Sequence, residues 1–177
     1  MLEDVEPGVR VENAEMMSVE SKRTTFEEMS EKDRRAILKT LERLRVTCLS
    51  AEAGYEEAAN EVAEEATLRD FLRSLAVERR GFARRLTELI VSYGHKPGST
   101  PSVKPQMHRA WIDLRRFLEH HDPKALVSEC LRAEKAASVQ YQAATRKPLP
   151  LEVERVLSDQ LAAIRSARVG LAATRRA

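Results

Sequence analysis

Apolar residues recur at steps of three and four along most of the chain after Ser30. Such steps place side chains on one face of a helix, so the pattern predicts a series of amphipathic helices. The first run follows Ser30-Glu-Lys-Asp33, where a hydroxyl three residues before an acid is typical of a helix N-cap. The face of this first helix is predicted to carry Ile37, Leu41, Leu44, Cys48, Ala51, Tyr55, Ala58 and Val62.

A second run begins after a break near residues 63–66 and ends at the Gly- and Pro-rich stretch 93–101. Glu78 falls three residues after Leu75 and four before Phe82, so the spacing predicts that this carboxylate shares their apolar side, with Arg79 competing for the same stripe. Glu52 is expected at the edge of the first helix's apolar face. The apolar positions of the second run are Leu68, Phe71, Leu72, Leu75, Phe82, Leu86, Leu89 and Tyr93.

In the second half of the chain, the spacing of apolar residues predicts one shorter helix and two long ones. The shorter helix, residues 103–118, carries Met107, Ala110, Trp111, Leu114, Phe117 and Leu118 and is interrupted by His120-His121-Asp122-Pro123. Asp122 suits an N-cap and Pro123 the first helical position, so a new helix is expected there, with Glu134 inside its stripe. After Lys147-Pro-Leu-Pro150, a last helix is expected with Gln160 facing the core.

These elements predict an all-α protein, a four-helix bundle over residues 30–177 with a short extra helix before the third main helix. Residues 1–29 show no sustained period and contain Pro7-Gly8, so a flexible or loosely docked N-terminal arm is expected. Met16, Met17 and Phe26 could pack part of this arm onto the body or onto a partner.

Composition supports a single helical domain and limits the kinds of partner that the protein is expected to bind. The 177 residues include only 6 Gly and 7 Pro, which favours helices. A net charge of +2 gives no overall field that would recruit nucleic acid or a membrane surface. Cys48 and Cys130 match no zinc spacing and are interpreted as buried free thiols. No apolar run approaches the ~20 residues that span a bilayer, so a cytoplasmic protein is expected.

Several stretches of the chain resemble a known family: Ala53–Ala59, Leu75–Phe82, His108–Leu114, Glu129–Glu134 and Gln140–Ala144. The most distinctive are Gly-Tyr-Glu-Glu-Ala-Ala at 54–59 and His-x-x-Trp at 108–111. Between Ile37 and Leu171 the chain resembles a bacterial ferritin-like four-helix-bundle family, a domain of unknown function. The resemblance implies a ferritin-like fold and no assigned activity.

Ferritin-like bundles that hold two iron or manganese ions take one Glu from each of two helices and a Glu-x-x-His from each of the others. Glu52 and Glu134 could supply the single carboxylates. However, Glu78 is followed three residues later by Gly81, and the last helix offers Gln160 followed by Ala163, so both imidazoles are missing.

The weak candidates for a metal site are therefore Glu52, Glu78, Glu134 and His108, with iron or manganese as an alternative to no cofactor at all. The competing interpretation pairs the carboxylates with arginines such as Arg79, Arg132 or Arg168, because an unpaired buried carboxylate is costly. His108 could instead pack near Trp111.

Other chemistry finds little support in the sequence. No Gly-rich phosphate loop, nucleophile elbow or zinc-protease motif occurs, so the sequence does not favour an enzyme. The arginine pairs at 79–80, 84–85, 115–116 and 175–176 lie among acidic residues or at a helix end, which favours a salt-bridged surface over a nucleic-acid site.

The leading hypothesis is a non-enzymatic interaction or stress-associated module that forms a homo-oligomer or binds another protein. Small residues such as Ala133, Ala137 and Ala144 permit close helix approach, within the bundle or between copies. Two alternatives stay open: a carboxylate-bridged metal-binding protein, and an apolar ligand held between helices near Trp111, Phe82 and Tyr141.

Overall fold

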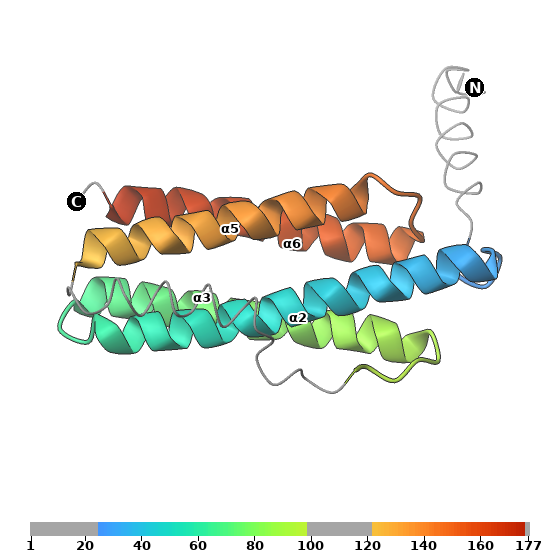
Figure 1. The fold of residues 1–177 in the computed structure, drawn as a ribbon, viewed down its shortest axis with the longest axis horizontal. Helices are drawn as coiled ribbons and strands as arrows, with labels where there is room; N and C mark the ends of the chain where they lie inside the picture. Colours follow the sequence, from blue (N-terminus) through green and yellow to red (C-terminus); the bar gives the residue numbers. More distant parts are fainter. Residues whose placement is uncertain (1–24, 99–121, 176–177) are drawn as a thin grey trace, which may run out of the picture.

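The computed structural model describes residues 25–98 and 122–175, which form four helices (Figure 1). These are α2 (Glu31–Glu61), α3 (Ala66–Ser92), α5 (Pro123–Thr145) and α6 (Leu151–Thr174), and the described ranges contain no strand. The prediction of an all-α helical bundle is confirmed. The predicted helix at 103–118 and most of the predicted arm, residues 1–24, lie outside the described residues.

Local capping signals fix where the helices begin. The Ser30 hydroxyl accepts a hydrogen bond from the Asp33 backbone N–H at 3.2 Å, which satisfies one of the free donors at the start of α2. The Asp122 carboxylate does the same for the Lys124 N–H at 2.9 Å, and Pro123 occupies the first turn of α5. Both helix starts were predicted correctly.

The helices form two pairs that lie side by side. α2 packs along α3 and α5 along α6, and the pairs meet through α2–α5 and α3–α6 contacts (Figure 1). Each of these four pairings joins antiparallel helices, as the contacts of Thr47 with Gln140 and of Tyr55 with Glu134 show for α2 and α5.

The connection between α3 and α5 joins opposite ends of the bundle. After α3, Gly94 adopts a φ of 74°, the left-handed conformation that ends many helices. The Gly98 carbonyl then accepts a hydrogen bond from Arg45 Nη2 at 2.8 Å, in the first half of α2. Asp122, which directly precedes α5, lies in a hollow with Val62 at the far end of α2. Gly98 and Asp122 therefore lie at opposite ends of the bundle.

The predicted apolar stripes of the described helices form the core. The first helix's stripe is buried apart from Ala51, which is half-buried, and Cys48 and Cys130 are buried free thiols, as expected. Phe26, from the end of the predicted arm, is also buried and stacks on Tyr93 with ring centroids 3.7 Å apart. None of the described helices is long and apolar enough to cross a membrane.

Candidate functional site

A buried ion pair between α3 and α5 lies in the interior of the bundle. Arg79 and Glu134 are each 1% exposed, and two nitrogens of the guanidinium reach the carboxylate: Nη2 to Oε2 at 2.8 Å and Nε to Oε1 at 3.3 Å. Burial is the strongest single influence and works against the charge of Arg79, but the charge and hydrogen bonds of Glu134, with smaller contributions from Tyr55 and Glu78, together raise the pKa of Arg79. The pair is therefore charged and bidentate, the strong form of such an interaction.

Neighbouring groups complete the hydrogen bonding of this pair. The Tyr55 hydroxyl, from α2, donates to Glu134 Oε1 at 2.5 Å, and Arg79 Nη1 donates to Glu78 Oε1 at 2.6 Å. The Arg79 guanidinium carbon also lies 5.0 Å from the centre of the Phe82 ring. Burial, followed by the nearby charge of Glu134, raises the pKa of Tyr55 well above its usual range, so this phenol stays protonated.

A second polar network links all four described helices without any charge. The Tyr141 hydroxyl donates to Gln160 Oε1 at 2.7 Å, so it accepts from the Cys48 thiol, 3.1 Å away. Gln160 Nε2 in turn donates to the Phe82 carbonyl at 3.4 Å. Burial raises the pKa of Cys48 to about 11, so at neutral pH it is a thiol rather than a nucleophilic thiolate.

The structure corrects the orientation predicted for Glu78. The Arg79 side chain points into the core, whereas the Glu78 side chain is 36% exposed at the rim. The reason is that the buried stripe of α3 passes through Ala76 and Ala83. Phe82, whose spacing from Glu78 predicted an inward carboxylate, is only half-buried. The small side chains of Ala76 and Ala83 on this stripe leave room for the long inward side chain of Arg79.

The three weak metal candidates that the structure describes are each held by an arginine. Glu52 is held by Arg80, with Nε 2.5 Å from Oε1, and Glu78 and Glu134 are both held by Arg79. The residues that the structure describes contain no group of three or more His, Cys, Asp or Glu side chains that could hold a metal ion. His108 lies outside the described residues.

The arginine-rich surface is salt-bridged where the structure describes it. Arg84 and Arg85 both reach Glu88, at 3.9 and 3.1 Å, and Arg85 also reaches Glu152 of α6 at 3.2 Å. This agrees with the predicted pairing of these arginines. Arg132, expected to pair with a core carboxylate, instead pairs with Glu129 on its own helix.

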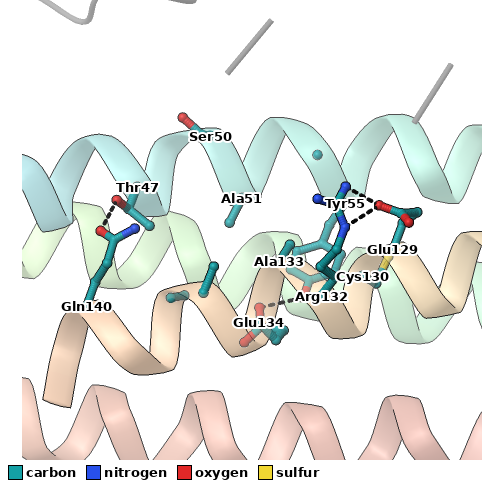
Figure 2. A pocket seen from close by; sticks show the side chains of 13 residues that line it. Thr47, Ser50, Ala51, Tyr55, Glu129, Cys130, Arg132, Ala133, Glu134 and Gln140 are labelled. Atoms are coloured by element: carbon teal, nitrogen blue, oxygen red, sulfur yellow. Dashed lines mark hydrogen bonds and ion pairs between the residues drawn. The ribbon is translucent and has the colours of Figure 1, made fainter. Parts of the chain in front are cut away.

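A groove of about 350 Å³ opens between α2 and α5 (Figure 2). A hydrogen bond from Thr47 Oγ1 to Gln140 Oε1, 3.0 Å long, crosses between the two helices, and the Arg132–Glu129 pair lies farther along α5. Small residues dominate the lining, which consists of Thr47, Ser50, Ala51, Gly54, Tyr55, Glu129, Cys130, Arg132, Ala133, Glu134, Ala136, Ala137 and Gln140.

The sequence indicated small residues that allow close helix approach, but it did not indicate the groove. Of the three alanines expected to allow close helix approach, Ala137 and Ala144 are buried, while Ala133 is exposed. Ala133 faces the groove together with Ala136, and Ala51 and Gly54 contribute from α2. The pairing of α2 with α5 was not readable from the sequence, so these two sets of small residues could not be assigned to one surface.

The bundle and its interior define a class: an all-α protein with neutralised core charges and a groove between two helices. A family model described as Domain of unknown function (DUF2383) matches residues 36–147, and the chain belongs to this family. The matched range includes α5 and the part of α2 from residue 36 onward, with all the α2 residues that line the groove, and stops before α6. Comparison with curated proteins finds no match.

Proposed function

We propose that this protein is a non-enzymatic interaction module with a ferritin-like bundle, and that its groove between α2 and α5 binds an amphipathic helix. The observation that carries the proposal is the lining of the groove. Alanine and glycine on facing walls leave room for the larger apolar side chains of another helix, as in close helix packing.

The path of the chain supports the ferritin-like part of the proposal. In a simple up-and-down bundle, each helix begins beside the end of the previous one. Here α5 begins at the opposite end from where α3 finishes, so the bundle has one long crossover between its second and third main helices. A single long crossover is the arrangement typical of ferritin-like folds.

The interior supports a non-enzymatic role. The buried carboxylate Glu134 is already matched by Arg79 and Tyr55, and the buried thiols of Cys48 and Cys130 have pKa values raised by burial to about 11 and about 12. These groups stabilise the packed helices, and none is poised for acid–base or nucleophilic work at neutral pH. Free buried thiols also favour a reducing compartment such as the cytoplasm.

Self-association is the form of interaction that we propose for the purified protein. Light scattering coupled to size-exclusion chromatography would measure its mass over a range of concentrations. We expect the mass to rise with concentration, and we expect Ala133→Glu to suppress the rise because it places a charge on the groove wall.

The matched control is Val139→Glu, which adds the same charge to α5 at a position that is 57% exposed and outside the groove lining. This variant should associate like the unmodified protein. A mass that stays monomeric at every concentration would reject self-association, and equal effects of the two variants would reject the groove as its surface.

A further inference from the structure

The two ends of residues 99–121 are both anchored against α2, on either side of the groove. At one end, Gly98 accepts a hydrogen bond from Arg45. At the other, Asp122 lies with Glu61 and Val62 at the end of α2. The groove's lining on α2 runs from Thr47 to Tyr55, between these two anchors.

The distance along α2 between the two anchors also agrees with the length of the helix predicted for the segment. From Arg45 to Val62, α2 rises by about 25 Å at ~1.5 Å per residue. A helix over residues 103–118, as the apolar spacing predicts, would be about 24 Å long by the same measure. Short linkers at 99–102 and 119–121 would then join it to the two anchors.

The chemistry of the segment complements the groove. Its predicted stripe is made mostly of large apolar side chains, whereas small side chains dominate the groove walls. The stripe consists of Met107, Ala110, Trp111, Leu114, Phe117 and Leu118. Packing large residues onto small ones is how helices pack closely, and burying an indole alone removes about 150–250 Å² from water.

We propose that residues 103–118 dock this apolar stripe into the α2–α5 groove of their own chain. The proposal rests on the proposed function, because it names the helix that the groove binds. Since both ends of the segment are held against α2, beyond the two ends of the groove, docking within one chain has a high effective concentration. A second copy would then enter the groove by exchanging its own 103–118 segment for the resident one.

Trp111 is the only tryptophan of the chain, so its fluorescence reports on the segment without any label. In dilute, monomeric protein we expect emission at shorter wavelength than in urea-unfolded protein and a several-fold smaller acrylamide quenching constant. Ala133→Glu and Ala136→Glu should move both values toward those of the unfolded chain, while Val139→Glu leaves them unchanged. Far-UV circular dichroism would confirm that each variant keeps its helices.

A disulfide test identifies which chain supplies the segment. A helix that starts beside Arg45 and ends beside Val62 places Leu114 at the level of Tyr55, which contacts α5 next to Ala133. The pair Leu114→Cys and Ala133→Cys should therefore oxidise to a disulfide within one chain, seen as a faster-migrating monomer on a non-reducing gel. Leu114→Cys with Val139→Cys, outside the groove, is the control and should stay reduced. Because Cys130 lines the groove one turn from Ala133, both double variants also carry Cys130→Ala, so that the gel reports only on the introduced thiols.

The outcomes separate this inference from the proposed function. An intrachain disulfide with a groove-dependent Trp111 signal supports docking, even if light scattering finds only monomer. An exposed Trp111, a protected Trp111 that ignores Ala133→Glu, or a disulfide that joins two chains in dilute protein would overturn docking within the chain. Groove-dependent association could still be observed in each of those cases.

Discussion

At the scale of single residues, the most demanding feature is the charged pair Arg79–Glu134 in the bundle interior. A buried ion pair is not by itself strong evidence of stability, because both ions lose their hydration. Here the carboxylate also accepts from Tyr55, and the guanidinium also donates to Glu78. The pair joins α3 to α5, and Tyr55 adds α2, so it fixes how three helices are aligned along the bundle.

Removing one member of the Arg79–Glu134 pair should therefore lower the free energy of unfolding far more than removing both. We expect Glu134→Leu to lower the free energy of unfolding by about 3–5 kcal/mol, because it leaves the Arg79 charge buried without its main partner. The double variant Arg79→Met with Glu134→Leu should recover most of that loss. Urea unfolding followed by circular dichroism measures both.

Two further variants complete this test. Tyr55→Phe in the double variant should restore another ~1–3 kcal/mol, since the hydroxyl would otherwise be buried without its acceptor. Glu129→Leu, which removes an acid of α5 that pairs with the exposed Arg132, should cost at most about 1 kcal/mol. If the double variant is as unstable as the sum of its single changes, the pair does not act as a unit.

The sequence could show that a charged residue enters the stripe of α3, but not which one. Glu78 and Arg79 are neighbours, and an apolar stripe about 100° wide can include either. Which of the two side chains points into the core depends on Glu134, more than fifty positions away in the chain, and on the packing of α3 against α5. The spacing of a single helix does not contain that information.

At the scale of the helices, the two glycines inside α3 and α6 have different surroundings. A Cβ added at Gly81 would meet nothing within 4 Å, whereas one at Gly170 would come within 2.7 Å of Phe71 Cζ. Gly81 is therefore not required by packing, although it occupies the position where a di-iron helix would carry histidine.

We expect Gly81→Ala to stabilise the protein by about 0.5–1 kcal/mol, because alanine loses less backbone entropy than glycine in a helix. Gly170→Ala gains the same entropy but must displace the Phe71 ring, so its net gain should be smaller or negative. Urea unfolding of the two variants side by side checks the difference. A larger gain for Gly170→Ala would show that the ring moves freely and that the contact is unimportant.

Helix positions were predictable because their signals are local. Ser30, Asp122 and the glycine at 94 act on the backbone within a few residues, so they marked the helix ends correctly. The groove was not predictable, because it exists only where α2 and α5 meet, and their small residues lie far apart in the chain.

At the scale of the whole molecule, the charge of the buried carboxylate Glu134 is matched by a side chain of the bundle itself. The positive charge opposite Glu134 is the guanidinium of Arg79. A divalent ion that used Glu134 would have to displace Arg79 and leave that charge buried, at a cost of about 3–5 kcal/mol before any metal–ligand bond forms. Glu52, held by Arg80, would have to leave its partner as well.

We therefore expect protein purified without chelators to contain much less than one equivalent of iron or manganese. Elemental analysis measures this content, and anaerobic calorimetric titration with Fe²⁺ or Mn²⁺ should show no stoichiometric binding. Glu78→Ala serves as the matched variant, because it removes a candidate ligand that is already at the rim. Stoichiometric binding that disappears in Glu78→Ala would mean that the carboxylates exchange their arginines for a metal ion. The ion pairs of Glu78 and Glu134 with Arg79 would then be only the resting state of a metal-binding bundle.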